Sequence, residues 1–110
     1  MRIERELMRG AGPMAVLRLL SGGEKYGYEL VQLLDRRTSG VLAMGQSTLY
    51  PLLYNLEAKG LIASRTEKAS NGRPRRYYRI TENGGKRLMR DLQQWETISA
   101  AMGQLGMTGT

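Results

Sequence analysis

The sequence predicts a mainly α-helical fold with one small β-hairpin, and three observations lead to this prediction. Apolar residues recur at helical spacing in three separate segments before residue 60. Two short strand-like runs then flank Asn71-Gly72, a dipeptide that readily adopts the positive φ angles of a tight turn. A last helical pattern follows the hairpin. With 110 residues, the chain is long enough for one compact core and too short for two independent domains.

The first helix is expected from Met14 to Leu20, after a short and weakly amphipathic lead from Arg2 to Arg9. The stretch Gly10-Ala11-Gly12-Pro13 is expected to interrupt the chain between them. Pro13 suits the first turn of the helix that follows, because its missing N–H has no partner to lose there. Gly22-Gly23 ends this helix.

The next two helices have the clearest apolar periodicity. In the first of them, the apolar positions i, i+4, i+7 and i+8 are Tyr26, Leu30, Leu33 and Leu34. Gly40 ends it, and Val41-Leu42 is an apolar connector that is compatible with one short strand. The other helix runs from Gln46 to Lys59, with a stripe formed by Leu49, Leu52, Leu53 and Leu56. Pro51 is close enough to its first turn to be tolerated.

The hairpin is predicted to consist of strands Leu61–Lys68 and Arg75–Ile80, and Thr81 is expected to cap the final helix. The apolar spacing along that helix alternates between four and three, which is typical of a packing seam between helices. The seam comprises Leu88, Leu92, Trp95, Ser99 and Met102. Residues 81–105 are therefore expected to form a dimerisation helix, and residues 106–110 a frayed tail.

Composition excludes several classes of enzyme and metal site. The chain has no Cys and no His, which removes disulfides, zinc sites of the Cys/His type, Cys nucleophiles and His general bases. Glu29 and Glu57 are interpreted as helix-surface or ion-pair residues, since nothing indicates the shared cleft that paired catalytic carboxylates need. We therefore expect no enzyme, no cofactor and no metal. No apolar run approaches the ~20 residues of a membrane helix, and no signal peptide is recognisable, so a cytoplasmic location is expected.

The positive charge is concentrated in one third of the chain. The net charge is +7, and residues 62–90 carry all of it, because nine cations there face only Glu67 and Glu82. The nine cations are Arg65, Lys68, Arg73, Arg75, Arg76, Arg79, Lys86, Arg87 and Arg90. A localised basic patch is typical of a protein that binds a polyanion, although an ordinary solvated face is the simpler alternative.

Two helices with a short glycine-containing connection, followed by a basic hairpin, make a winged helix-turn-helix, here expected at residues 1–80. In this fold a helix enters the major groove of duplex DNA and the hairpin contacts the backbone nearby. The helix from Gln46 to Lys59 is the predicted recognition helix, and it is uncharged as far as Asn55. The residues predicted to contact DNA are Gln46, Ser47, Thr48, Tyr50, Pro51 and Tyr54 of the helix, and Lys68, Asn71, Gly72, Arg73 and Arg75 of the hairpin.

The residues alone leave other interpretations open. Many winged helices bind no DNA, so the uncharged face could dock a protein or an RNA. Tyr50 and Tyr54 could also be core residues of a partly buried helix. Tyr77 and Tyr78 are adjacent on a strand and point to opposite faces, so one is expected in the core and the other partly exposed. Arg79 is a candidate for an ion pair with an acidic neighbour.

Four segments of the chain resemble the PadR-like transcriptional regulators, and they are Tyr26–Leu30, Ser47–Glu57, Gly60–Ile62 and Arg75–Thr81. The resemblance covers about residues 10–91. Its most specific part is the pairing of Leu-Tyr-Pro in the recognition helix with Arg-Tyr-Tyr before the last helix. It implies a cytoplasmic bacterial or archaeal repressor, and in some members a response to aromatic small molecules. The single helix after the hairpin resembles the short subfamily, whose members form homodimers through that helix.

Trp95 lies on the predicted seam and has two interpretations. It can anchor a dimer interface, because a Trp buries a large apolar area, and we favour this interpretation. The resemblance to multidrug-sensing regulators also implies a platform on which a flat aromatic effector stacks near the dimer axis. The residues predicted for the interface or ligand site are Leu7, Met14, Leu88, Leu92, Trp95, Ser99 and Met102. A dimer would present two recognition helices about one DNA turn apart (~34 Å) to a pseudo-palindromic operator.

Overall fold

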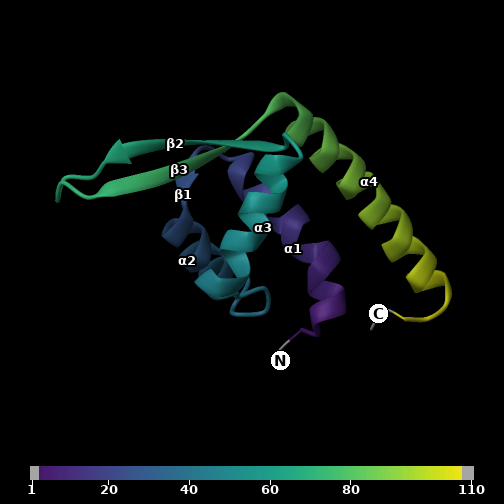
Figure 1. Cartoon of the computed structure of the whole chain (residues 1–110). Helices are drawn as coiled ribbons and strands as arrows, with labels where there is room; N and C mark the ends of the chain where they lie inside the picture. The colour runs from purple at the N-terminus through teal and green to yellow at the C-terminus, as the bar shows by residue number, and fades with distance from the viewer. Residues whose placement is uncertain (1–2, 108–110) are drawn as a thin grey trace.

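The structure is a computed structural model in which residues 3–107 are described. Its elements are α1 (Arg5–Leu20), β1 (Lys25–Tyr26), α2 (Gly27–Arg37), α3 (Gln46–Ala58), β2 (Ile62–Lys68), β3 (Pro74–Ile80) and α4 (Glu82–Gln104). The hairpin β2–β3 projects to one side of the helical body and α4 leaves it on the other (Figure 1). The predicted fold class is confirmed. Of the tail predicted to fray, residues 108–110 lie outside the described residues.

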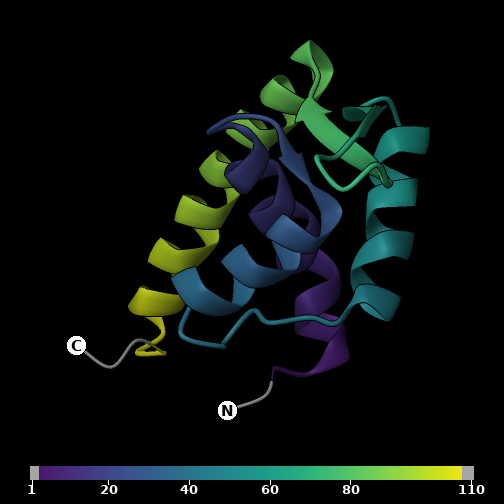
Figure 2. The same ribbon diagram turned by 90° about the vertical axis from the view of Figure 1, so that its left-hand side faces the viewer.

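α1 lies at the centre of the body and contacts α2, α3, α4 and β3, an arrangement that can be followed in Figure 2. The most deeply buried side chains are Val16, Leu17, Leu20, Leu30, Leu34, Leu49, Leu53 and Ile62. Burial of each Leu or Ile side chain contributes about 1.5–3 kcal/mol relative to its exposure. The predicted stripe of α3 is confirmed, since three of its four leucines are buried and Leu52 packs against them.

α1 is one continuous helix, so the predicted interruption at residues 10–13 is wrong. Pro13 lies in the middle of this helix rather than in the first turn of a new one. Packing overrides the local preference, because the face that carries Val16 and Leu20 is buried against the other elements. Gly12 serves this packing. A Cβ at that position would lie 3.2 Å from Leu52 Cδ1, so glycine lets α1 and α3 approach closely.

The sheet has three antiparallel strands in the order β1–β3–β2. β1 has no counterpart among the predicted strands, because two residues are too few to show a period. The strand considered at Val41-Leu42 is wrong, since this segment forms a turn, in which Leu42 N–H donates to Thr38 Oγ1 (3.0 Å). On β3, Tyr78 is buried and Tyr77 is half-buried, as alternation along the strand predicts. Burial raises the pKa of the Tyr78 phenol.

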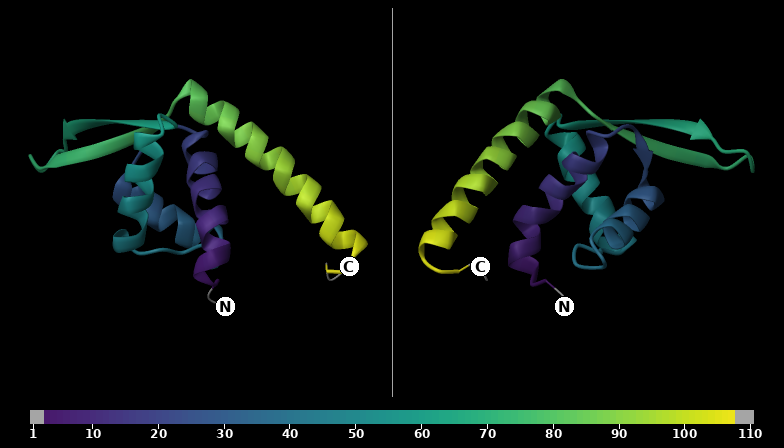
Figure 3. Two further views of the ribbon diagram at one scale, coloured as in Figure 1. Left: turned by 45° about the vertical axis from the view of Figure 1, so that its right-hand side comes forward. Right: turned by 180° about the vertical axis from the view of Figure 1, so that it is seen from behind.

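α4 begins at a capped N-terminus and then diverges from the body. The predicted cap is confirmed, because Thr81 Oγ1 accepts a hydrogen bond from Gly84 N–H (3.0 Å). Gly84 is buried against the bend between α3 and β2, and a Cβ there would lie 1.9 Å from the Leu61 carbonyl oxygen. Leu88 is the last α4 side chain that is fully buried. Beyond it the helix moves away from α1 toward its C-terminal end (Figure 3).

Candidate nucleic-acid interface

The outer face of α3 is uncharged and exposed. Leu49 and Leu53 are fully buried on its inner side, and Leu52 packs against the core beside them, so the opposite side of the helix points outward. All six residues predicted to read DNA from this helix are exposed, namely Gln46, Ser47, Thr48, Tyr50, Pro51 and Tyr54. Tyr54 is 74% exposed and Tyr50 is 40% exposed, which excludes the alternative in which both are core residues. Hydroxyl, amide and aromatic groups on a protruding helix can contact base edges and thymine methyl groups.

Tyr50 also packs against the start of α2. Gly27, the first residue of α2, is buried. A Cβ on Gly27 would lie 2.7 Å from Cε1 and 2.8 Å from the hydroxyl oxygen of the Tyr50 ring. The Tyr50 ring therefore occupies the space in which any other residue at position 27 would place its side chain. This contact joins the candidate recognition helix to the helix that precedes it.

The tip of the hairpin is shaped by Asn71 and Gly72. Gly72 has a φ of 81°, a left-handed conformation that favours glycine. Arg73 N–H donates to Asn71 Oδ1 (3.0 Å), and Ala69 N–H donates to the Arg73 carbonyl (2.8 Å). The Arg73 and Lys68 side chains are exposed. Within residues 3–107, neither of these two cations has a carboxylate at ion-pair distance, so both can meet phosphate.

Two arginines on the outer face of the sheet lie over tyrosine rings. The Arg75 guanidinium is 4.2 Å from the centroid of the Tyr26 ring, and that of Arg65 is 4.8 Å from the Tyr77 ring. The two rings meet edge to face at 5.8 Å. In such contacts the cation is attracted to the negative face of the aromatic ring. Arg75, which was predicted to contact phosphate, thus also holds β3 to β1.

Arg65 is bound by carboxylates on both sides. Its Nη2 and Nε donate to Glu24 at 2.6 and 3.0 Å, and its Nη1 donates to Glu67 at 2.6 Å. The hydrogen bonds from Arg65 lower the pKa of Glu24, and the two carboxylates raise the pKa of Arg65 further above its usual value. These bonds tie the turn before β1 to β2, and they occupy donors of Arg65 that a phosphate would otherwise engage. For Arg79, the predicted ion pair is not found among the described residues.

The inner face of the hairpin, which points toward α3, carries a second ion pair. Arg76 Nη2 donates to Glu57 Oε1 (3.2 Å), and Ser64 Oγ donates to Glu57 Oε2 (2.5 Å). The interpretation of Glu57 as an ion-pair residue is confirmed. Arg76 had no predicted role. Strand alternation places Arg76 on the same face as the buried Tyr78, but it does not identify Glu57 as the partner.

A cleft of about 330 Å³ separates the start of α2 from the hairpin, with Tyr50 of α3 in its wall. Its polar lining includes Tyr26, Tyr28, Tyr50, Arg73, Arg75 and Arg76. Phenol hydroxyls and guanidinium groups are donors that bind the phosphate oxygens of DNA. The cleft lies beside Tyr50 of α3 and the hairpin tip, both of which carry predicted DNA-contacting residues.

Comparison with known proteins identifies the family, because residues 16–90 match the transcriptional regulator PadR-like family. The chain belongs to this family. A transcriptional regulator of Mycobacterium tuberculosis is 36% identical over 95 residues, which cover 86% of this chain and 85% of that protein. The crystal structure of a PadR-family transcriptional regulator from Eggerthella lenta has 36% identity and a TM-score of 0.82, and the match covers 94% of this chain and 88% of that one. A transcriptional regulator from Clostridium thermocellum has 29% identity and a TM-score of 0.82, with coverages of 90% and 96%.

Membership of the PadR-like family makes this chain a DNA-binding transcriptional regulator with a winged helix. The resemblance stated from the sequence is confirmed, and the family consists of transcriptional regulators rather than enzymes. No helix within residues 3–107 has the length and apolar character needed to cross a membrane. The same residues contain no cluster of acidic side chains placed to hold a metal ion. Which residues of this PadR-like regulator contact DNA stays a prediction.

The residues predicted for a dimer interface or ligand site divide into two groups. Leu88 is 5% exposed and packs in the core of its own chain, so little of its side chain is available to a partner chain or a ligand. Met14 and Leu92 are half-buried against the same core. Apolar spacing along α4 could not reveal this, because it shows which side of a helix is covered and not which chain covers it.

The other four predicted residues are exposed, and they are Leu7, Trp95, Ser99 and Met102. Trp95 is 53% exposed, which is unusual for the largest apolar side chain in a small protein. On the same side of α4, Ile98 is also exposed and was not included in the predicted seam, and exposed Leu105 follows at the C-cap. The outer part of α4 thus carries an apolar surface that its own chain leaves uncovered.

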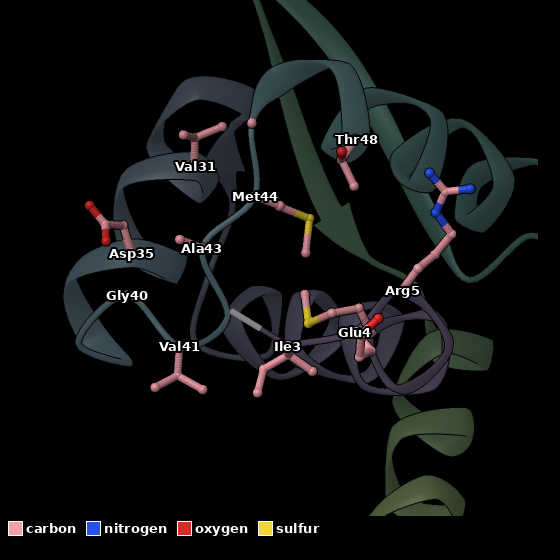
Figure 4. A pocket seen from close by; sticks show the side chains of 12 residues that line it. Ile3, Glu4, Arg5, Val31, Asp35, Gly40, Val41, Ala43, Met44 and Thr48 are labelled. Carbon is pink, nitrogen blue, oxygen red and sulfur yellow. The ribbon is translucent and has the colours of Figure 1, made fainter. Parts of the chain in front are cut away.

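A larger open hollow of about 970 Å³ lies at the N-terminal end of α3, bordered by the start of α1 and the loop before α3. In Figure 4, the Met44 side chain extends into it below Thr48, and Arg5 lies at its edge. Thr48 is the one predicted DNA-contacting residue among those that line it. The charged residues that line the hollow have both signs, namely Glu4, Asp35 and Arg5, so the hollow shows no preference for an anion.

Proposed function

We propose that this PadR-like regulator binds a pseudo-palindromic DNA operator as a homodimer and represses transcription there. The observation that carries the proposal is the exposed, uncharged face of α3 beside a basic hairpin. A merely solvated helix would favour Glu and Lys at these positions, and none occurs between Gln46 and Asn55. Absence of charge suits a surface that must distinguish bases, while the neighbouring hairpin supplies the attraction to the backbone.

Different residues have different roles in this proposal. Gln46, Ser47 and Thr48 lie in the first turn of α3, the part of a recognition helix that reaches base edges. Tyr54 extends the contact one to two turns further on. Lys68 and Arg73 neutralise phosphates and release counterions, so the affinity must fall as the salt concentration rises. Asn71 and Gly72 support these contacts by shaping the tip, and Tyr50, Pro51 and Arg75 border the DNA.

The apolar surface of α4 supports dimerisation. Trp95, Ile98 and Met102 are each more than 40% exposed, and a second copy of α4 packed against them would remove them from water. Residues 81–105 would then act as the dimerisation helix, and residues 1–80 as the DNA-binding unit. The two α3 helices would lie about one turn of DNA apart (~34 Å).

Gel-shift titration of promoter fragments at two salt concentrations tests the DNA function. We expect one fragment to bind much more tightly than the others, and the affinity for every fragment to fall at the higher salt concentration. Binding that depends on neither sequence nor salt would contradict the proposal. Recovery of a cellular protein or an RNA, but no duplex DNA, in a pull-down would favour the other interpretation of the α3 face. Derepression of the adjacent gene in a deletion strain would establish the direction of regulation.

We further propose that a flat aromatic effector relieves repression by stacking on Trp95. This is the only Trp of the chain, so its emission reports on one environment per protomer. Titration with a flat aromatic cation such as berberine should quench the emission, and the same concentrations should release the operator in a gel shift. If the cation releases the operator while the Trp95 emission stays unchanged, the effector site lies elsewhere.

A further inference from the structure

We propose that Glu57 and Arg76 form a clamp that sets the angle between the recognition helix and the hairpin. Arg76 is then a positioning residue, although it lies in the basic hairpin and would be counted among the phosphate ligands by its charge alone. The inference rests on the DNA interface proposed above. It concerns how the protein fixes the geometry of that interface before DNA binds.

The clamp joins three elements through one carboxylate and one hydroxyl. Glu57 lies in the last turn of α3, Ser64 on β2 and Arg76 on β3. Arg76 Nε and Nη2 donate to Ser64 Oγ at 3.0 and 2.9 Å, and Arg76 Nη2 also reaches Glu57 Oε1 at 3.2 Å. Ser64 Oγ donates its own hydrogen to Glu57 Oε2 at 2.5 Å. Each of the three side chains thus binds both of the others.

The clamp restrains the hairpin at a position from which it controls where the tip lies. Ser64 pairs with Tyr78 in the half of the hairpin nearer its base, whereas Asn71 lies at its tip. A rotation about the base therefore moves Arg73, which lies beyond Arg76 toward the tip, further than it moves Arg76. A phosphate hydrogen bond tolerates only a few tenths of an ångström, so the clamp decides whether the tip meets the backbone while α3 occupies the groove.

The arginines of the hairpin consequently divide into two groups. Arg65 is held by Glu24 and Glu67, and Arg76 by Glu57 and Ser64. Among the described residues, Arg73 has no such partner. The Arg76 and Glu57 side chains are 57% and 31% exposed, and ion pairs this accessible to water add little to stability. Orientation, rather than folding energy, is what the clamp supplies.

Removal of Glu57 tests the two possible roles of Arg76, because they predict opposite changes in the affinity for DNA. If Arg76 contacted phosphate, Glu57→Ala would free it and remove a negative charge near DNA, so binding would tighten. The clamp predicts that Glu57→Ala weakens binding several-fold. The probe is a duplex of about 30 base pairs, roughly three helical turns, selected from a random pool with the full chain. Glu67→Ala is the matched control. It also removes one negative charge, but Arg65 retains its hydrogen bonds to Glu24.

The salt dependence supplies a second readout that a merely structural change would not move. Arg73→Ala should reduce the slope of log K against log salt by about 0.9 for each phosphate that the side chain neutralises in the parent. Arg76→Gln should lower the affinity at every salt concentration and leave the slope unchanged. The double variant Glu57→Ala/Arg76→Gln should bind no more weakly than either single variant, because the two residues act as one unit. Glu57→Gln, which can still accept from Arg76 and bond to Ser64, should bind nearly as well as the parent.

Thermal unfolding of each variant separates loss of the clamp from loss of the fold. If Glu57→Ala does not fold, Ser64→Ala gives an independent measurement, because it removes the hydroxyl shared by both partners and should also weaken binding. Tighter binding by Glu57→Ala, or a reduced salt slope for Arg76→Gln, overturns the clamp. A parent chain that binds no duplex would instead refute the proposed function, so the two failures are distinguishable.

Discussion

The ring of Tyr50 fills the space that a side chain at Gly27 would need, with Cε1 at 2.7 Å from the position of that absent Cβ. The contact links two of the four segments that carry the resemblance to PadR-like regulators, since Gly27 lies in the first and Tyr50 in the second. They are 23 positions apart in the printed sequence and meet where α2 begins. The glycine therefore helps to determine how far Tyr50 stands out from the recognition helix.

Gly27→Ala should displace the Tyr50 ring rather than the backbone, because the end of a side chain moves more easily. We expect a loss of about 1 kcal/mol in the free energy of unfolding, the lower end of overpacking costs, and several-fold weaker operator binding. Urea unfolding and gel-shift titration measure the two effects. In a Tyr50→Ala background the added methyl meets no ring, so Gly27→Ala should there cost little stability. An equal cost in both backgrounds would show that the strain comes from elsewhere.

Two adjacent glycines in the first turn of α4 should respond in opposite directions to the same substitution. A Cβ on Gly84 would lie 1.9 Å from the Leu61 carbonyl oxygen, whereas a Cβ on Gly85 would meet nothing within 4 Å. That carbonyl also accepts from Thr81 N–H (3.1 Å), so it cannot easily move away. Gly84→Ala should lower the free energy of unfolding by about 3 kcal/mol or more. Gly85→Ala should raise it by about 0.5–1 kcal/mol, because alanine is the better helix former.

Local patterns predicted the parts of the fold whose causes are local. The leucine stripe of α3 follows from helical spacing, and the hairpin follows from Asn71-Gly72 between two strands. The break expected at Pro13 did not occur, because contacts of α1 with the rest of the core outweigh the preference of a few residues. β1 was missed because its two residues form a strand only through their pairing with Tyr77 and Tyr78.

The candidate site was predictable only in part, because local sequence patterns do not show how the elements pack against one another. The exposure of Tyr54 and the uncharged face of α3 follow from which side of one helix is apolar. The pairing of Arg76 with Glu57 depends on how β3 lies against α3, and no spacing along the chain encodes that relation. Leu88 was assigned to an interface because its spacing shows a covered side, whereas the structure shows that its own chain covers it.

Substitutions on α3 and at the hairpin tip should have distinguishable effects on DNA recognition. Arg73→Ala should weaken binding to all sequences alike, because phosphate contacts carry no sequence information. Tyr54→Ala should change the preferred sequence, because its 74% exposed side chain stands on the face that reads bases. Removal of one base-reading side chain costs about 1–3 kcal/mol at the affected position. Selection from a random duplex pool measures both variants, and a sequence shift caused by Arg73→Ala alone would reverse the assignments.

Tyr78 should make the fold sensitive to alkaline pH. Burial raises the pKa of its phenol above the ordinary value of 10.0, so the unfolded chain releases this proton at a lower pH than the folded chain. The stability that Tyr78 contributes is therefore complete below about pH 10 and falls as the pH rises through the folded pKa. Urea unfolding on both sides of pH 10 measures the loss. Tyr78→Phe should show a weaker pH dependence, whereas Tyr54→Phe, which alters an exposed phenol, should behave like the parent.

Trp95→Ala tests whether the exposed face of α4 is the dimer interface. Large aromatic side chains at the centre of an interface commonly contribute about 2 kcal/mol or more to binding, which corresponds to a roughly 30-fold higher Kd of the dimer. Because Trp95 is half-exposed in the single chain, its loss should leave the fold of the protomer intact, and circular dichroism can verify this. Sedimentation at several protein concentrations measures dimer formation. Gln93→Ala is the control, since it shortens a nearby exposed residue that projects from the opposite side of α4. A Trp95→Ala chain that dimerises as tightly as the parent would place the interface on another surface.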